Sequence, residues 1–203
     1  ELTAAVTDAV RSGKKSAEPI GYQAIAASPR DLQLCAKTYA ADHCPESRTP
    51  LWSGEKYANP RIRIGYVSGE LRNQATAFLI TELIELHDKN RFDVFAFDNG
   101  WDDGSAIRAR INRACTEVVN IAGLDDHAAA ALIRARRIDI LVNLNGYFGR
   151  ERQGVFSLRP CPVQVNYLGF PGTLGANYMD YIVADRHVIP PDEQAFYTEK
   201  VVY

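Results

Sequence analysis

The segment LDDHAAAALIRARRIDILVNL, residues 124–144, contains two different patterns side by side. Its first part, 124–137, is alanine-rich with an acidic start and a basic end, which is the charge order that a helix dipole favours. Its second part, 138–144, is a short apolar run that favours a β-strand. The segment therefore predicts a helix that leads directly into a strand.

The same alternation continues on both sides of this segment. The chain predicts further strands at 61–67, 91–97, 117–121, 162–168 and 181–185 and helices at 75–87 and 105–115, and it ends in a strand-like run at Lys200–Tyr203. Strands alternating with helices of this length are typical of βαβ units and a mostly parallel sheet. Because parallel crossovers are right-handed, we expect an α/β fold, a Rossmann-like three-layer α/β/α sandwich.

Residues 1–45 are alanine-rich and predict an α-helical segment. Within it, Ser28 is predicted as an N-cap and Pro29 as the first helical residue. The following helix has one face formed by Leu32, Cys35, Ala36 and Tyr39. Residues 46–60 are rich in proline and turn formers and predict an ordered linker, so the Rossmann-like lobe is expected to span 61–203.

Composition bounds the class of protein. The 203 residues are 46% hydrophobic and 24% charged, as in ordinary globular proteins, and the net charge of −2 gives nucleic-acid binding no electrostatic support. No apolar run approaches the roughly 20 residues of a membrane helix. The four cysteines are scattered without metal-ligand spacing, so we expect reduced thiols, no metal site and a cytoplasmic location. The absence of an initiator methionine suggests a piece of a longer protein.

Three predicted loops follow strands and are expected to meet at one edge of the sheet, where ligands of such folds bind. They are residues 68–76, 145–152 and 169–176. The last loop concentrates Gly169, Pro171, Gly172 and Gly175, and it is expected to bring backbone N–H groups close to an anion. The first loop contains no G-x-G-x-x-G and no Walker motif follows, which disfavours a free-standing nucleotide-binding domain.

Candidate chemical groups have structural alternatives. His87 is predicted as a helix C-terminal residue that interacts with the dipole. DNGWDDGS, residues 98–105, favours a turn and helix cap over an acid/base pair. Arg150, Arg152 and Arg159 could hold phosphate, although a salt-bridged face is the favoured interpretation. No catalytic residue is identified.

Five segments together resemble the catalytic region of the O-GlcNAc transferase and SPINDLY-like glycosyltransferases, in bacterial form. They are RIRIGYVSGELRNQAT, ELHDKNRFDVFAFDNGWDDGSAIRARI, IDILVNLNGY, SLRPCPVQVNYLGFPGTLGANYMDYIVAD and FYTEKVVY. The resemblance covers roughly residues 50–203, and residues 1–45 resemble the connection between the family's TPR superhelix and its catalytic core.

The resemblance implies a GT-B enzyme that moves a sugar from a nucleotide sugar, usually UDP-GlcNAc, to Ser or Thr of an acceptor protein with inversion and without a metal. SPINDLY relatives in plants use GDP-fucose, so the donor stays open. The expected partners are therefore the donor, an acceptor protein and a second lobe that holds most nucleotide contacts. This chain resembles the first lobe, which by itself is expected to be inactive.

The resemblance also implies positions for the donor site. Gln74 occupies the place of a family histidine that points into the cleft, and glutamine cannot exchange a proton near neutral pH. The family's N-G-Y-T loop is matched by Asn145, Gly146, Tyr147 and Phe148. Its L-G-Y-P-G-T loop is matched by Leu168, Gly169, Phe170, Pro171, Gly172 and Thr173. The glycines are expected to let the backbone approach a sugar nucleotide, so that Gly172→Val would remove activity and leave the fold intact.

Two hypotheses follow from this pattern. The chain is the acceptor-side lobe of a protein glycosyltransferase, or it belongs to a degenerate, TPR-linked scaffold that binds proteins without chemistry. The replacement of the histidine by Gln74 and of the threonine by Phe148 keeps the second hypothesis open.

Overall fold

The computed structural model describes residues 1–203, and its centre is one seven-stranded sheet in which every neighbouring pair is parallel. The strands are β1 (Ile62–Ser68), β2 (Phe92–Asp98), β3 (Glu117–Asn120), β4 (Ile140–Asn143), β5 (Val163–Tyr167), β6 (Tyr181–Val183) and β7 (Lys200–Val202). Their order across the sheet is β3-β2-β1-β4-β5-β6-β7. The predicted strands and the parallel sheet are confirmed.

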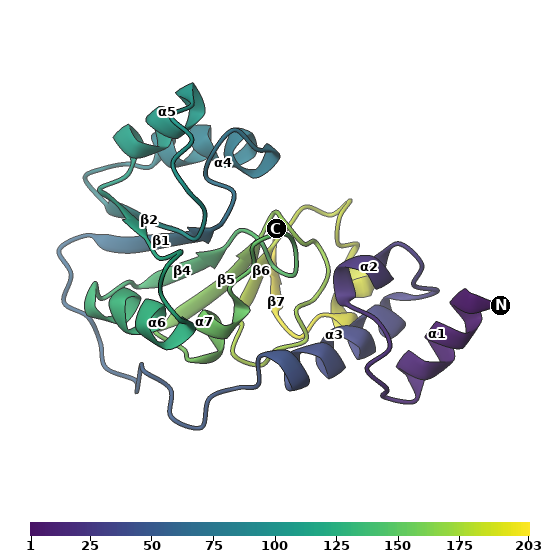
Figure 1. Ribbon diagram of the computed structural model, residues 1–203. Coiled ribbons are helices and arrows are strands. Elements are labelled where there is room, and N and C mark those ends of the chain that lie inside the picture. The colour runs from purple at the N-terminus through teal and green to yellow at the C-terminus, as the bar shows by residue number, and fades with distance from the viewer.

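Helices cover both faces of the sheet and complete three layers (Figure 1). One face carries α4 (Ala75–Leu86) and α5 (Ala106–Ala114). The other carries α3 (Pro29–His43), α6 (Asp126–Ala135) and α7 (Gln153–Ser157). The remaining helices are α1 (Leu2–Arg11), α2 (Pro19–Gln23) and the 3₁₀ helix η1 (Pro191–Phe196). The predicted Rossmann-like sandwich is therefore confirmed.

Local sequence explains where several of these helices begin. The hydroxyl of Ser28 accepts the backbone N–H of Asp31 at 3.2 Å, and Pro29 is the first residue of α3. Ser105 caps α5 and Asp125 caps α6 in the same way. Each cap supplies an acceptor to an N–H that the helix itself leaves unpaired.

α4 buries a different face from the one that its large apolar residues mark. The residues that reach the core are small or β-branched: Thr76, Ala77, Ile80, Thr81 and Ile84. The exposed ones include Phe78, Leu79 and Leu86, at 61%, 66% and 75%. Leu79, Leu83 and Leu86, like Ala77, Ile80 and Ile84, repeat at intervals of three or four residues, so periodicity could not decide between the two faces. Close packing of α4 on the sheet and against α5 selects the smaller residues.

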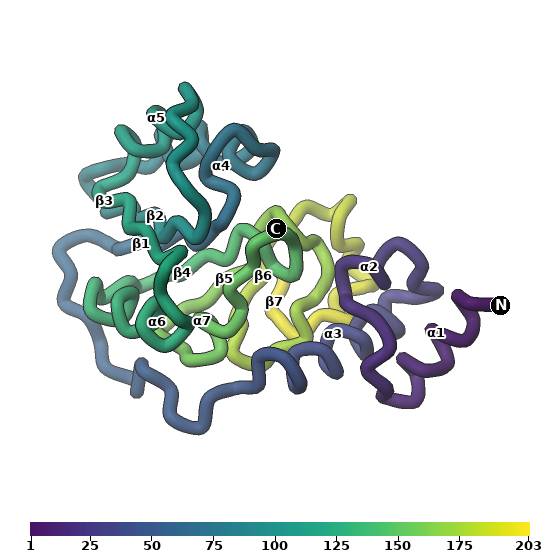
Figure 2. The backbone as a smooth tube through the Cα atoms, viewed as in Figure 1, coloured from purple at the N-terminus to yellow at the C-terminus, as the bar shows by residue number.

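The N-terminal helical segment shares its core with the lobe. Ala36 and Ala40 of α3 belong to the same buried cluster as Phe156 and Phe170. Figure 1 and Figure 2 both place α2 and α3 beside the part of the sheet that contains β6 and β7. The linker is also attached, since the backbone N–H groups of Leu51 and Trp52 donate to residues that follow α7. α3 and the linker are thus packed onto the lobe, whereas α1 and α2 pack on α3 around a small cluster of their own.

No helix has both the length and the apolarity that crossing a membrane requires. All four cysteines are free thiols, of which Cys35 and Cys161 are buried.

Candidate functional site

The candidate site is the carboxyl edge of the sheet, which we define as the loops 68–76, 98–105, 145–152 and 169–176. In the strand order, β1 lies between β2 and β4, so the chain winds outward in opposite directions from the β1–β4 pair. Such a switch point is where open parallel sheets bind ligands, outside the carboxyl ends of the strands. The loops after β1 and β4 meet there, as the sequence predicted.

Asparagine side chains hold these loops together. The Oδ1 of Asn145 accepts the N–H of Gly69 at 3.1 Å, and its Nδ2 donates to the carbonyl of Phe148 at 2.9 Å. The Oδ1 of Asn143 accepts the backbone N–H groups of Asn145 and Gly146, at 3.0 and 2.9 Å. Asn145 is only 2% exposed, so its amide is an internal link between the β1 and β4 loops.

The glycines make room for neighbouring loops. A Cβ on Gly169 would lie 2.9 Å from the carbonyl oxygen of Asn145, and a Cβ on Gly172 would lie 2.7 Å from Cζ of Phe170 and 3.2 Å from Leu32 of α3. Phe170 is fully buried, so it has little room to move aside. The structure therefore gives a reason to expect that Gly172→Val also disturbs the packing of this loop, in addition to any effect on activity.

The backbone N–H groups of this edge are also engaged within the chain. Side-chain oxygens accept the N–H groups of Gly69, Glu70, Asn73, Gly100, Asn145 and Gly146. An anion at these positions would have to displace these acceptors. None of these N–H groups lies in the 169–176 loop, so the N–H cradle expected in that loop stays a prediction.

The C-terminal segment fastens the 169–176 loop. The hydroxyl of Thr173 donates to Glu199 at 2.6 Å, and the other carboxylate oxygen of Glu199 accepts the N–H of Leu174 at 2.7 Å. The hydroxyl of Tyr197 donates to the carbonyl of Pro171 at 3.0 Å. Sequence reasoning gave Tyr197 and Glu199 no role, although they stand in the FYTEKVVY segment that carried the resemblance.

Replacing Glu199 with alanine is expected to lower the free energy of unfolding by about 2 kcal/mol, because the Thr173 hydroxyl and the Leu174 N–H would stay buried without an acceptor. Burial raises the pKa of Glu199, so its contribution to stability fades as the pH rises through that pKa. The loss should therefore be larger at pH 5 than at pH 8. Urea unfolding at both pH values measures it.

Asp192→Ala is the matched control, since it removes an exposed carboxylate from η1, close in sequence to Glu199. An equal loss in both variants would contradict the assigned role of Glu199.

A cavity of about 350 Å³ lies at the carboxyl edge between the ends of β5 and β6. We call it the edge cavity, and it is lined by Tyr167, Leu168, Phe170, Pro171, Ile182, Val183, Ala184, Asp185 and Val188. Leu168 has φ of +73°, a left-handed conformation that is costly for leucine. Strain of this kind collects at functional sites and is held in place by the surrounding contacts. The edge cavity thus combines a mainly apolar lining with one residue in a strained conformation.

The residues predicted for the donor site fall into three classes of exposure. Gln74 and Phe148 are exposed, and the Gln74 side chain precedes α4 without making a capping hydrogen bond. Partly exposed positions are Leu168, Gly169 and Pro171. The buried positions are Asn145, Gly146, Tyr147, Gly172 and Thr173. Residues of the first two classes can contact a ligand, whereas the buried residues support the loops from the interior of the protein.

The other candidate groups have structural roles. The Nε2 of His87 lies 2.7 Å from the Tyr66 hydroxyl, and burial lowers the pKa of His87. His87 is the C-cap of α4 as predicted, but a lowered pKa disfavours the imidazolium that the helix dipole would attract, so the dipole interpretation is corrected. Arg152 pairs with Asp126 and Arg159 with Asp180. In the loop 98–105, Ser105 is a helix cap, as predicted.

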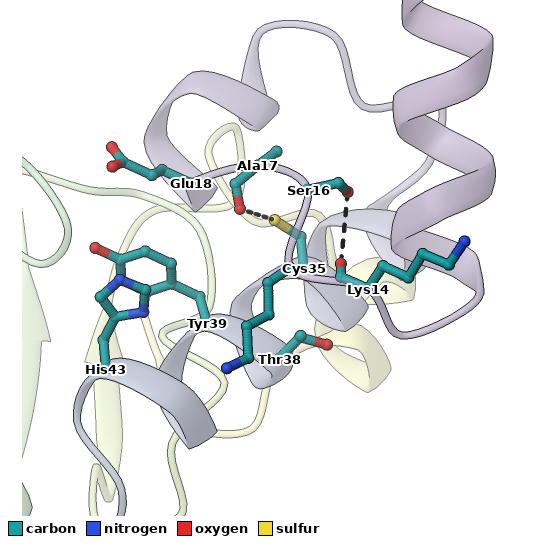
Figure 3. A pocket seen from close by; sticks show the side chains of 9 residues that line it. Lys14, Ser16, Ala17, Glu18, Cys35, Thr38, Tyr39 and His43 are labelled. Carbon is teal, nitrogen blue, oxygen red and sulfur yellow. Dashed lines mark hydrogen bonds between the residues drawn. The ribbon is translucent and has the colours of Figure 1, made fainter.

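A second cavity, of about 250 Å³, lies away from this edge between α3 and the connection from α1 to α2 (Figure 3). In it Tyr39 stacks on His43 with ring centroids 4.0 Å apart, and the Cys35 thiol donates to the carbonyl of Ala17. Tyr39 also contacts Tyr147 edge to face at 5.0 Å. This cavity belongs to the helical segment, and Tyr39 connects that segment to the β4 loop.

Comparison with known proteins gives consistent results. The model of glycosyl transferase family 41 matches residues 21–203. The probable UDP-N-acetylglucosamine–peptide N-acetylglucosaminyltransferase SEC of Arabidopsis thaliana is 36% identical over 143 residues, which are 70% of this chain and 15% of that protein. The UDP-N-acetylglucosamine–peptide N-acetylglucosaminyltransferase of Caenorhabditis elegans is 35% identical over 160 residues, 77% of this chain and 14% of that protein.

A solved structure shows the same fold. A mutant of the Thermobaculum terrenum O-GlcNAc transferase superposes with a TM-score of 0.83 and 33% identity, over 91% of this chain and 36% of that one. The chain thus spans a minor part of each relative's length. The match extends through the sheet, both of its helical layers and all the loops of the carboxyl edge, and on this basis the chain belongs to glycosyl transferase family 41.

Proposed function

We propose that this chain is the first of two Rossmann-like lobes of a GT-B protein O-glycosyltransferase. The intact protein would transfer GlcNAc from UDP-GlcNAc to Ser or Thr of an acceptor protein, with inversion and without a metal ion. Residues 1–45 would connect the lobe to TPR repeats, and the protein would act in the cytoplasm.

The observation that carries the proposal is the edge cavity in a chain of this family. Part of its apolar lining, Leu168, Phe170 and Pro171, comes from the loop that the family resemblance matched to the donor site, and Leu168 is held there in a strained conformation. Sugar rings and acetamido methyl groups bury apolar surface of this kind, whereas a diphosphate does not. The relatives named above carry the transfer of N-acetylglucosamine to peptides in their names.

The residues of this chain would position the substrates, but they would not activate the acceptor hydroxyl. Gln74 is exposed and can accept or donate a hydrogen bond, but it cannot take a proton from an acceptor hydroxyl. A base and the groups that neutralise the leaving diphosphate would have to come from the second lobe or from the donor itself.

Gln74 also supports the second candidate, a degenerate scaffold that binds proteins without transfer. The sequence downstream of this chain separates the two cheaply. A second Rossmann-like lobe that keeps a lysine for the diphosphate favours the enzyme, and its absence favours the scaffold.

The decisive experiment incubates the full-length protein with a panel of nucleotide sugars and candidate acceptor proteins, followed by mass spectrometry. We expect a HexNAc mass on Ser or Thr with UDP-GlcNAc, also in the presence of EDTA. Transfer of another sugar would correct the donor, and no transfer with any donor would reject the enzyme.

Filling the edge cavity should weaken donor binding. Ala184→Phe in the full-length protein is expected to raise the KM for UDP-GlcNAc roughly tenfold or more, which corresponds to about 1.4 kcal/mol. Ala184→Ser adds almost no volume and serves as the control, and thermal unfolding checks that both variants fold. An unchanged KM in a folded Ala184→Phe protein would place the donor elsewhere.

A further inference from the structure

Trp101, in the loop after β2, has two arginines against its ring. The Cζ of Arg72 lies 3.9 Å from the ring centroid, and the Cζ of Arg150 lies 5.2 Å away. Cation–π attraction holds guanidinium groups at such distances. Trp101 is itself 48% exposed, so two cations are gathered at an open aromatic side chain on the carboxyl edge.

Only one of these arginines is neutralised. Arg72 is buried, pairs with Glu70 at 3.1 Å and donates to the carbonyl of Gly69. Arg150 is exposed, and its guanidinium forms no hydrogen bond or ion pair within the chain. Its backbone carbonyl accepts from Asn99 at 3.2 Å, and its Cβ packs on Gly69, so the residue is anchored while its charge stays free.

The carboxylates of the carboxyl edge all have partners within the chain. Glu70 pairs with Arg72, and Asp98 and Asp102 pair with Arg108. Asp103 and Glu151 accept backbone N–H groups. A partner for Arg150 would therefore come from outside the chain.

The surroundings of Arg150 suit a carboxylate better than a diphosphate. A diphosphate needs several donors, but the backbone N–H groups of the β1 and β4 loops already have side-chain acceptors, as described above. A single guanidinium can hold one carboxylate by two parallel hydrogen bonds. On the basis of the function proposed above, we propose that Trp101 and Arg150 form a subsite for an acidic side chain of the acceptor polypeptide.

The sheet sets the distance of this subsite from the edge cavity. The ends of β2 and β5 are three strand spacings apart, or about 14 Å. An extended polypeptide advances about 3.4 Å per residue. If the sugar is held at the edge cavity, the acidic residue of the acceptor would lie about four positions from the modified Ser or Thr.

The test uses the full-length protein, UDP-GlcNAc and a synthetic peptide library. Each peptide has one Ser or Thr and carries either Asp or Asn at one of the five positions on each side. The native protein is expected to prefer Asp at a position three to five residues away. In Arg150→Ala, the KM for that Asp peptide should rise about tenfold with kcat unchanged, while the KM values for its Asn twin and for UDP-GlcNAc stay the same.

Arg186→Ala is the matched control, because Arg186 is also exposed and lies 5.0 Å from an aromatic ring, that of Tyr203, near β7. It should keep the preference for Asp. Arg150→Glu should instead favour a Lys peptide. Fluorescence anisotropy with labelled Asp and Asn peptides, in the presence of UDP, reads the same difference as binding without any transfer.

The possible outcomes distinguish a failure of the proposed subsite from a failure of the proposed transferase function. Transfer without a preference for Asp, or with a preference that survives Arg150→Ala, would overturn the subsite and leave the enzyme standing. A raised KM for UDP-GlcNAc in Arg150→Ala would assign Arg150 to the donor diphosphate and also overturn it. Absence of transfer from every peptide would count against the enzyme, while an Asp preference in anisotropy that Arg150→Ala abolishes would still support the subsite.

Discussion

Replacing Arg108 with methionine is expected to cost about 4 kcal/mol of unfolding free energy, the largest effect of any substitution proposed for this chain. Arg108 of α5 donates to Asp98 at the end of β2 over 2.5 Å, and both side chains are almost fully buried. It also donates to the carbonyl of Leu71 at 3.0 Å. Methionine keeps much of the volume but leaves the Asp98 carboxylate buried beside no cation.

Urea unfolding of the 203-residue chain measures this loss of stability. Two further variants show whether the buried ion pair is its cause. Asp98→Asn combined with Arg108→Met should recover much of the stability, because the uncompensated charge is then gone. Arg110→Met is the matched control on the same helix, since its pair with Glu85 is exposed and should contribute little. If Arg108→Met and Arg110→Met lower the unfolding free energy equally, the buried Arg108–Asp98 pair stabilises the fold no more than the exposed pair does.

The Arg108→Met substitution should also loosen two loops of the carboxyl edge. Arg108 links the β2 loop that carries Trp101 to Leu71 in the β1 loop that carries Gln74. Without it, both loops lose their common attachment to α5.

Gly175→Ala is expected to cost about 3 kcal/mol, the second largest effect. Gly175 has φ of +65°, and a Cβ there would lie 2.5 Å from the backbone carbonyl carbon of Ala36 in α3. The left-handed conformation costs an alanine about 1 kcal/mol, and the overlap with helix backbone, which cannot rotate away, adds about 2 kcal/mol. Urea unfolding measures the sum.

Gly104→Ala is the matched control for the conformational part. Gly104 has nearly the same φ, +67°, with no other heavy atom within 4 Å of its virtual Cβ. Its loss should be about 1 kcal/mol. If the two variants lose the same stability, α3 does not press on the 169–176 loop as the structure describes.

Much of the fold was predictable because the signals are local. The strands alternate with helices of ordinary length, and Ser28, Ser105 and Asp125 stand where N-caps are needed. The order of the strands and the buried face of α4 were not predictable from the same patterns. Both depend on how elements pack on one another, and the two apolar stripes of α4 both repeat at helical intervals of three or four residues.

The position of the loops at the carboxyl edge was predicted from the sequence, but the contacts within them were predicted only in part. The loops after β1, β4 and β5 do follow the carboxyl ends of their strands, and the LGFPGT loop borders the edge cavity. The interpretation of the glycines was incomplete, since Gly169 and Gly172 make room for Asn145, Phe170 and Leu32. A glycine in a sequence shows that space is needed, but it does not show which group fills that space.

The sequence by itself determined the α/β class, the positions of the elements and the family, because these depend on periodicity, caps and motifs within short segments. Only the tertiary structure decided that Glu199 holds Thr173 from 26 residues away and that α3 supports Gly175. It also decided that Arg150, unlike Arg152 and Arg159, keeps a free charge beside Trp101. Such contacts join residues distant in the chain, and their energies depend on burial and geometry that arise only when the layers have packed.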